Sequence, residues 1–342
     1  MNVSRVRQLL LAPLALAAFV VGFAATPASG GQSVHPLVGI ADENLPMFSD
    51  PRFLSLGIRQ VRFYVSWDVL SPAYHDHYRR NILTNWLRDA KADGLTPLIT
   101  FDHSDLRGRV AQLPTVAQFS KAFLAFRERW PWVKDFATWN EANYFGEPTA
   151  SNPQRVAGYY LALRRDCPTC TILAAELLDI GNRKEAIDEV TWAGEFVHYA
   201  RREPEYWGLH NYVSANQLST TSVRRLLGAV TGYIWLTETG GIVRFPHYGL
   251  PSFPLTAHHE AQVDSFLLNK LAAISPRIQR VYLYEWRALR KHSAWDSAVI
   301  GADNRPRPAY DVLANTLDSW GITPNSAIST LPPACAYSQP SP

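Results

Sequence analysis

The sequence predicts an α/β fold, a single (β/α)8 TIM barrel in which each of eight parallel strands precedes a helix. Short apolar stretches rich in β-branched and aromatic residues alternate along the chain with amphipathic stretches of helical length. Strands that alternate with helices form a parallel sheet, and eight of them favour closure into a barrel over an open sheet. No Gly-x-Gly-x-x-Gly motif follows the first strand, which removes the commonest use of the open alternative.

The individual elements are predicted from their apolar spacing and from the residues that start and stop them. Residues 81–93 have apolar side chains at helical spacing and end before Gly94. Asn152 and Pro153 provide a helix cap followed by proline at the first helical position. The strands are expected at residues 36–41, 60–65, 96–101, 136–139, 171–175, 206–209, 233–237 and 280–286. The helices are expected at residues 51–56, 81–93, 116–129, 152–166, 187–203, 222–228 and 257–274.

The two ends of the chain differ in composition from this domain. Residues 1–30 have the pattern of an export signal: two arginines, then an apolar run, then small residues with a cleavage site expected near Ala28. The run is short for a membrane span and no Cys follows it, so we expect a cleaved signal peptide and a secreted protein, with an uncleaved anchor as the alternative. Residues 31–320 are assigned to the barrel, and residues 321–342 form a Pro/Ser-rich tail.

Charge and composition narrow the classes of partner. The net charge is only +3 and the charges are scattered, which gives no electrostatic footprint for nucleic acid. The 11 Trp, 15 Tyr and 15 Phe suit a protein core and also suit the flat faces of sugars. Cys167 and Cys170 are expected to form a small structural disulfide, with free thiols or a metal as alternatives. Pairing of either with Cys335 also remains open.

Polar side chains gather where the predicted strands end. In a barrel all eight strand ends converge on one face, which is where this fold places its active sites. The fourth strand breaks off at Asn140 and Glu141, and the seventh ends at Glu238, 97 residues after Glu141. The residues expected to ring this face are Asp42, Glu43, Arg62, Trp67, Asp102, His103, Asn140, Glu141, Glu176, His210, Tyr212, Glu238 and Trp286.

Glu141 and Glu238 are expected to face each other across the mouth of the barrel. Cleavage of a glycosidic bond uses such a pair, with one carboxyl protonated to assist the leaving oxygen and the other ionised to attack or to activate water. The competing interpretation is a pair of ordinary charged strand ends bound to neighbours such as Arg62. That interpretation does not require the Asn beside the first Glu or the Gly-Gly pair two residues after the second.

The pattern resembles the clan A glycoside hydrolases, which are retaining (β/α)8 barrels. The shared features are Asn-Glu closing strand four, Glu closing strand seven, a strand six that bears His and Tyr, and Trp closing strand eight. Trp-Asn-Glu at 139–141 and Thr-Glu at 237–238 are most similar to the family 39 type. Residues 299–310 resemble the closing hairpin and last helix start of that clan, so the resemblance covers most of residues 36–318.

The resemblance implies a role for each matching residue. Glu141 would be the general acid/base, Glu238 the nucleophile of a double displacement, and Asn140 the donor to the sugar 2-hydroxyl. One departure is visible, because many relatives have Pro after the first Glu whereas this chain has Ala142 and Asn143. The loop is therefore expected to turn differently, which bears on the identity of the substrate more than on the mechanism.

Four further residues are expected to serve the substrate-binding site. Arg62 would orient Glu238 and lower its pKa, while His210 and Tyr212 would hydrogen-bond the nucleophile or the sugar. Trp286 would form a floor on which a sugar stacks. The alternative roles are a structural ion pair for Arg62 and core packing for the others. The remaining candidates for a catalytic role are Glu176, Asp102, His103, Glu43 and Glu285.

The sequence thus predicts a secreted glycoside hydrolase that acts on an oligo- or polysaccharide without a metal or cofactor, and without nucleic acid or stable membrane insertion. One alternative is a carbohydrate-binding barrel that has lost catalysis, against which the presence of both Glu argues. Another is a metal-dependent hydrolase that uses Asp102, His103 and His210, although the paired His spacing of such barrels is missing. The aromatic loop at residues 240–254 is expected to shape the subsites. Endo or exo action, the sugar and the oligomeric state are not defined by the sequence.

Overall fold

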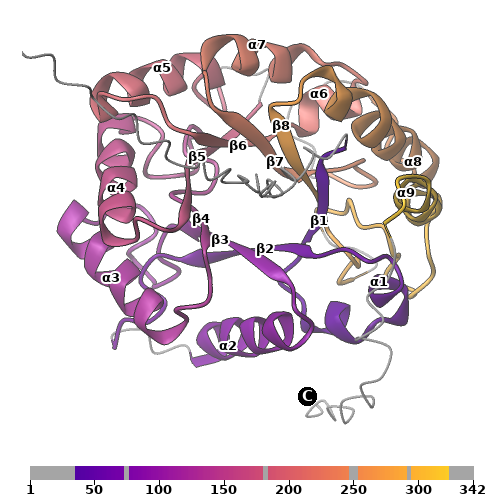
Figure 1. The fold of residues 1–342 in the computed structure, drawn as a ribbon, viewed down its shortest axis with the longest axis horizontal. Coiled ribbons are helices and arrows are strands. Elements are labelled where there is room, and N and C mark those ends of the chain that lie inside the picture. The colour runs from indigo at the N-terminus through magenta and orange to yellow at the C-terminus, as the bar shows by residue number, and fades with distance from the viewer. Residues whose placement is uncertain (1–34, 73–76, 180–183, 246–252, 291–293, 323–342) are drawn as a thin grey trace, which may run out of the picture. The chain divides into compact units, whose positions relative to one another are not determined.

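In the computed structural model, the strands form one closed parallel barrel, which confirms the predicted fold class. The structure describes residues 35–72, 77–179, 184–245, 253–290 and 294–322. Within these ranges, eight strands follow one another around the ring in sequence order, and the last closes on the first through pairs from Leu37–Arg280 to Ala41–Tyr284. Figure 1 shows the ring of strands with the helices outside it.

The strands are short and almost entirely buried, as expected for a parallel sheet covered on both faces. They are β1 (Leu37–Ala41), β2 (Gln60–Ser66), β3 (Thr96–Asp102), β4 (Asp135–Ala137), β5 (Thr171–Leu178), β6 (Tyr206–His210), β7 (Tyr233–Thr239) and β8 (Ile278–Tyr284). Because all eight run in the same direction, their carboxyl ends meet on one face of the barrel. We call this face the mouth.

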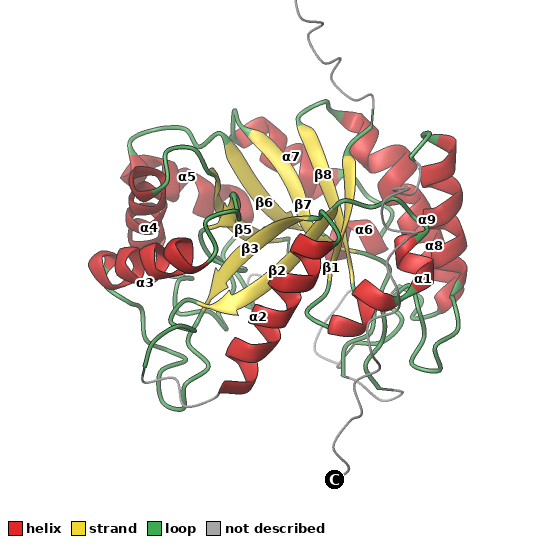
Figure 2. Ribbon diagram, turned by 60° about the horizontal axis from the view of Figure 1, so that its bottom comes forward, coloured by secondary structure: helices red, strands yellow, loops and turns green. Residues whose placement is uncertain are grey.

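The helices pack around the strands, as Figure 2 shows from the side. They are α1 (Pro51–Leu54), α2 (His77–Ala92), α3 (Val116–Arg129), α4 (Pro153–Asp166), α5 (Glu189–Ala200), α6 (Tyr212–Asn216), α7 (Thr221–Ala229), α8 (Ala257–Phe266) and α9 (Pro308–Ser319). Thr115 opens α3 with a capping box, in which its hydroxyl and the side chain of Gln118 each bond the other residue's backbone N–H. Helix α8 continues as a π turn and a 3-10 turn to Ile274, which agrees with the predicted helix at 257–274.

Three differences from the predicted elements bear on the mouth. Strand β5 runs three residues further than expected, so Glu176 lies within the strand rather than after it. Strand β8 ends at Tyr284, so Trp286 lies in the loop that follows. A short helix, α6, begins at Tyr212 where only a strand end was expected. The apolar pattern of β5 stops at Glu176, which is charged. An apolar pattern therefore predicts too short a strand when a charged side chain of that strand is paired inside the barrel.

Two layers of apolar side chains hold the barrel together. The larger layer lies between the strands and the helices, and two of its buried indoles donate their N–H groups to backbone carbonyls. Trp86 donates to the carbonyl of Asp42 at 2.9 Å, and Trp192 donates to that of Ala150 at 3.0 Å. The smaller layer fills the inside of the barrel and consists of Ala41, Leu98, Ala137, Leu173, Trp235 and Tyr282. These side chains fill the barrel below the polar cluster of the mouth.

The predicted disulfide is present between Cys167, which caps the C-terminus of α4, and Cys170, which precedes β5. Their Cα atoms are 5.4 Å apart, within the usual range for a disulfide. Cys335, the predicted signal peptide and all but the first two residues of the predicted tail lie outside the described residues, as does part of the loop at 240–254. No described helix combines the length and the apolar character that crossing a membrane requires.

Candidate active site

Arg62 is the centre of the polar cluster in the mouth. Its side chain extends from β2 and is fully buried. Its Nε and Nη2 donate to the two carboxylate oxygens of Glu176 on β5, at 3.0 and 2.5 Å. Nη1 donates to Oε2 of Glu238 at 2.9 Å, and Nη2 also donates to Oδ1 of Asn140 at 2.9 Å. One guanidinium therefore joins residues from four strands or strand ends in a fixed arrangement.

Glu176 is the counter-ion of this cluster. Its carboxylate is fully buried and also accepts a hydrogen bond from the hydroxyl of Thr100 at 2.9 Å, and it lies 3.3 Å from Nε2 of His210. Burial alone would raise the pKa of Glu176, but the charges and hydrogen bonds of Arg62 and His210 outweigh burial and lower the pKa to about 2. Glu176 is therefore ionised across the physiological pH range and serves as a permanent negative charge.

His210 lies between the two carboxylates that the sequence singled out. Its Nδ1 is 3.1 Å from Oε1 of Glu141 and 3.8 Å from Oε2 of Glu238. Because both distances end on one nitrogen, these two carboxylate oxygens are at most about 7 Å apart. Burial would lower the pKa of His210, but Glu238, Glu141 and Glu176 together raise it to about 9. The imidazole is therefore protonated at neutral pH.

Glu141 follows β4 on a turn that tilts its carboxyl toward the barrel axis. Its φ angle is +41°, and its backbone carbonyl accepts from the N–H of Tyr144 at 2.8 Å. The side chain is 22% exposed. Burial is the main influence on the pKa of Glu141 and raises it, although the hydrogen bond and charge of His210 act in the opposite direction. A carboxyl that holds its proton to higher pH suits a group that gives a proton away.

Glu238 is held by a hydrogen bond at each oxygen. Oε2 accepts from Arg62, and Oε1 accepts from the hydroxyl of Tyr212 at 3.0 Å. The side chain remains 13% exposed, so it is open to the mouth. The two bonds fix the orientation of the carboxylate, as a nucleophile that attacks along one line requires.

Asn143 holds the loop that follows Glu141 in place. Its fully buried amide donates to the carbonyls of Leu178 and Ile187 at 2.9 and 2.8 Å, and its oxygen accepts from the N–H of Leu178 at 2.7 Å. The amide thus ties the loop after β4 to the end of β5. Three side-chain hydrogen bonds therefore hold this turn in place.

Trp286 occupies a different place from the one predicted. It is only 1% exposed, its ring packs edge-on against Phe53 and Tyr310, and its Nε1 donates to Asp50 at 3.1 Å. Its backbone N–H donates to Asp42 at 3.0 Å. The ring has no open face on which a sugar could stack, because β8 ends two residues earlier than predicted and the loop turns the indole toward α1 and α9. In this structure Trp286 is a packing residue.

A second polar group in the mouth joins Asp102 and His103 to Glu147. Of the described residues, these three alone place one potential ligand atom each within 4.8 Å of the others. Nδ1 of His103 lies 3.1 Å from Asp102 and 2.9 Å from Glu147, and these hydrogen bonds raise the pKa of His103 to about 10. The three side chains form an ion-paired triad in this structure. His210 does not belong to this group. The structure therefore does not bring together Asp102, His103 and His210, the three residues of the metal-site alternative.

Thr100 and Glu147 are the polar residues of the mouth that the sequence interpretation missed. Thr100 lies two positions after Leu98, which belongs to the inner layer, so the alternation of a strand places it inside the barrel. That alternation was the available signal. Glu147 is in the loop after β4, and its contact with Nε1 of Trp139 at 3.1 Å depends on a turn that no local pattern reveals.

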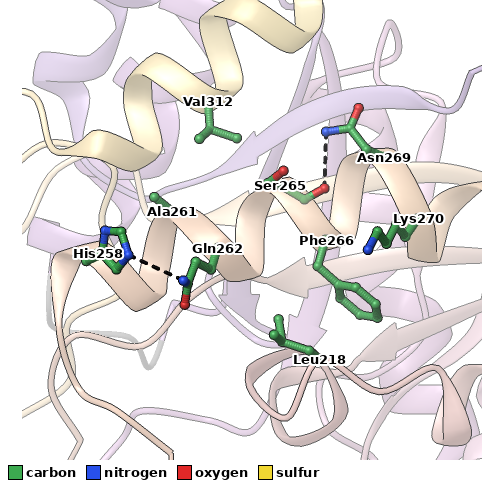
Figure 3. Close-up of a pocket in the computed structure, with 9 residues that line it drawn as sticks. All are labelled: Leu218, His258, Ala261, Gln262, Ser265, Phe266, Asn269, Lys270 and Val312. Carbon is green, nitrogen blue, oxygen red and sulfur yellow. Dashed lines mark hydrogen bonds between the residues drawn. The ribbon is translucent and has the colours of Figure 1, made fainter.

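A groove lies on the outer side of the barrel, apart from the mouth. It runs along α8 and is bordered by α9 and by the turn after α6, as Figure 3 shows. Its lining residues are Leu218, His258, Ala261, Gln262, Ser265, Phe266, Asn269, Lys270 and Val312. None of the strand-end residues described above lines it, so the groove and the mouth are distinct features.

Comparisons with known proteins give the class of fold. No protein-family profile matches the chain, and no curated protein matches it. Among solved structures, the chain is similar to a family 39 glycoside hydrolase from Bacteroides cellulosilyticus WH2, with 16% identity, a TM-score of 0.58, and coverage of 84% of this chain and 64% of that chain. This chain therefore spans less than two thirds of that enzyme.

Two further solved structures are similar to this chain over most of their own length. Xylanase 10B from Thermotoga maritima matches with 14% identity and a TM-score of 0.60, over 85% of this chain and 97% of that chain. A family GH5_18 protein from Streptomyces cattleya, solved with GlcNAc, matches with 15% identity and a TM-score of 0.58, over 84% of this chain and 80% of that chain. At these identities the similarity establishes a shared (β/α)8 fold.

Proposed function

We propose that this protein is a retaining glycoside hydrolase in which Glu141 is the general acid/base and Glu238 is the nucleophile. The observation that carries the proposal is the position of His210, whose Nδ1 lies 3.1 Å from one oxygen of Glu141 and 3.8 Å from one oxygen of Glu238, so that these two oxygens are at most about 7 Å apart. A retaining enzyme holds its two carboxyl groups roughly 5–5.5 Å apart, and this limit is compatible with that spacing. The fold shared with family 39, xylanase and GH5 structures supports the same class.

The proposed reaction gives each group a role in two steps. First, Glu141 transfers its proton to the leaving glycosidic oxygen while the carboxylate of Glu238 attacks the anomeric carbon and forms a glycosyl ester. Second, Glu141, now ionised, takes a proton from water, and the water oxygen displaces Glu238 from the anomeric carbon. The product keeps the original anomeric configuration. Asn140, whose oxygen is bound to Arg62, has its amide N–H₂ available for the sugar 2-hydroxyl.

The proposed substrate is an oligo- or polysaccharide. The solved neighbours include a xylanase in complex with xylobiose and another with xylopentaose, which supports a carbohydrate ligand for the same mouth. We also propose that the protein is exported, on the pattern of residues 1–30, and that the mature chain works outside the cytoplasmic membrane.

A covalent trapping experiment tests the mechanism. The wild type, Glu238→Gln and Glu141→Gln are each mixed with a panel of activated fluoro-glycosides and followed by time-resolved mass spectrometry. The proposal predicts a glycosyl adduct on the peptide that contains Glu238, and no adduct in Glu238→Gln. The exposed Glu203, which precedes β6 at the opposite end of the barrel, provides the matched control Glu203→Gln.

The outcomes of this experiment separate the proposal from its rivals. Hydrolysis with inversion, or an adduct on another carboxylate, would reject the assigned roles. Binding of oligosaccharides without turnover by the wild type would instead indicate a barrel that recognises carbohydrate without cleaving it. Activity that a chelator abolishes would point to the metal-dependent alternative.

A further inference from the structure

A group of carboxylates lies beside Glu238 on the side of the mouth formed by β1 and β8. Asp42 and Glu43 follow β1, and Glu285 follows β8. The two strands are paired up to Ala41 and Tyr284, so the residues that come next leave the barrel side by side. Asp42 is fully occupied, because its carboxylate accepts from Asn44 at 2.7 and 2.6 Å and from the N–H of Trp286 at 3.0 Å.

Glu43 and Glu285 have fewer partners, because Glu43 is bonded through the backbone N–H of Tyr64 and Glu285 through no described residue. Glu285 is only 6% exposed, and its side chain forms no hydrogen bond or ion pair with any residue that the structure describes. Oε1 of Glu43 is buried and likewise has no hydrogen-bond partner in the described ranges. A buried carboxyl oxygen without a partner is unfavourable, and a native structure that retains one calls for a water, an ion, a ligand or a functional role that accounts for it.

The electrostatic surroundings of the pair are negative. Burial and the neighbouring carboxylates raise the pKa of Glu43 to about 8 and that of Glu285 to about 9, and Glu238 contributes to both shifts. Arg62 acts on Glu43, but its N–H groups are engaged by Glu176, Glu238 and Asn140. The other ionisable groups that interact electrostatically with Glu43 or Glu285 are Asp42, Asp296, Tyr64 and Tyr284.

The lack of partners and the negative surroundings favour a cationic group that can donate hydrogen bonds. Of the described residues, the only group with ligand atoms close enough together to enclose a metal is Asp102, His103 and Glu147. Glu43 and Glu285 do not belong to such a group of three. An ammonium group on a sugar ring can instead reach each carboxyl through a separate hydrogen bond, as charge-assisted N–H donors do.

We propose that Glu43 and Glu285 form a subsite for the free amino group of an amino sugar, placed on the glycone side of the bond to be cleaved. The inference rests on the proposed glycosidase function, whose substrate class it narrows. Asn140 follows β4, across the barrel from β1 and β8, and would face the 2-position of the sugar bound at Glu238. The amine that Glu43 and Glu285 bind is therefore carried at another position of that sugar or by the next unit of the chain.

Direct binding tests this subsite without depending on catalysis. Tetrasaccharides of glucosamine and of galactosamine, with free or partly acetylated amines, are compared with their fully N-acetylated forms by isothermal titration calorimetry at pH 6. In at least one series, the wild type should bind an amine form roughly tenfold to a hundredfold more tightly than the acetylated form. Titration in two buffers of different ionisation enthalpy should also show proton release, because the ammonium displaces protons held by Glu43 and Glu285.

Isosteric variants identify the residues responsible. In Glu43→Gln, Glu285→Gln and the double variant, both the preference for the amine and the proton release should decrease, while Glu203→Gln should behave like the wild type. Equal binding of amine and acetylated forms in both series would overturn the proposal. So would an amine preference that survives the double variant, or a divalent cation that binds with the same dependence on Glu43 and Glu285.

The two proposals fail in different ways. If neutral aryl glycosides are cleaved through Glu238 and no amine preference exists, the glycosidase assignment stands and the amino-sugar subsite is rejected. If amine-bearing oligosaccharides bind through Glu43 and Glu285 but are never cleaved, the subsite stands and the glycosidase assignment is rejected.

Discussion

The guanidinium of Arg62 holds both carboxylate oxygens of Glu176, at 3.0 and 2.5 Å, at a point inside the barrel where neither side chain is exposed. The pair connects β2 with β5 and provides the fixed base on which His210, Asn140 and Glu238 are positioned. Two charges removed from water stabilise a fold only when their hydrogen bonds are complete, and here nearly every donor and acceptor is used.

Replacement of Glu176 should therefore be costly. In Glu176→Gln, Arg62 keeps its buried charge but loses the bidentate counter-ion, and the free energy of unfolding should fall by about 3–5 kcal/mol. Urea denaturation followed by tryptophan fluorescence measures this change. Glu203→Gln, which is exposed, should stay within about 0.5 kcal/mol of the wild type. A loss below about 1 kcal/mol in Glu176→Gln would show that Arg62 is compensated by water or by Glu238.

Glu141→Gln should lose activity in proportion to the need for acid assistance. With leaving groups of high pKa, the first step should slow by roughly 10²–10⁴-fold, whereas with dinitrophenyl leaving groups it should change little. The fall in wild-type activity at high pH, which follows the raised pKa of Glu141, should also disappear from the first step. Pre-steady-state kinetics of leaving-group release provides both readouts. Equal losses for all leaving groups would assign Glu141 a different role.

His210 should make stability depend on pH. Its pKa is about 9 in the folded chain and about 6.5 in an unfolded chain, so its stabilising contribution is complete below pH ~6.5 and is lost as the pH rises through about 9. The difference in unfolding free energy between the wild type and His210→Gln should therefore shrink by on the order of 3 kcal/mol from pH 6 to pH 10. His103 titrates in both proteins, so its contribution to the unfolding free energy cancels in this difference. A difference that grows with pH would mean that the folded chain holds a neutral imidazole.

Asn143→Ala should weaken the turn that carries Glu141. The variant leaves two carbonyls and one N–H without their partner, and the free energy of unfolding should fall by about 2–4 kcal/mol. The exposed Asn81 on α2 offers the control Asn81→Ala, which should be within about 0.5 kcal/mol of the wild type. If activity and stability of Asn143→Ala both match the control, water replaces the amide in this turn.

The disulfide between Cys167 and Cys170 should contribute modestly, because it closes a very short loop. The chain-entropy relation gives on the order of 2 kcal/mol for such a loop, and the variant with both residues changed to Ser should lose about that much stability. The wild type unfolded in the presence of a reductant should give the same value as the variant. A reductant effect with no effect of the double substitution would implicate another cysteine.

The repeating part of the molecule could be predicted from the sequence. Strands buried on both faces produce continuous apolar runs such as residues 96–101, and helices that cover them produce spaced apolar residues, so the order of elements in the barrel was visible locally. Asn140, Glu141 and Glu238 could be chosen because each interrupts or ends an apolar strand at a position that the barrel gathers on one face.

The contacts between strand ends could not be predicted in the same way. Arg62 and Glu176 are 114 residues apart, and nothing local shows that their side chains meet. Trp286 follows β8 as expected, yet the loop turns its ring away from the mouth toward Phe53 and Tyr310, which lie in α1 and α9. The orientation of a side chain in a loop depends on contacts with distant elements, and sequence spacing contains no information about them.

His210 sends one N–H toward two carboxylates that would exchange their charges during the proposed reaction. When Glu238 becomes an ester it loses its negative charge, and Glu141 gains one by giving up its proton. The hydrogen on Nδ1 then has a single charged acceptor, which is already the nearer of the two. Because Glu238 loses its charge as Glu141 gains one, the net charge of this cluster stays constant through the first half-reaction. Negative charge passes from one side of the fixed imidazolium to the other, and no ion has to enter or leave the barrel.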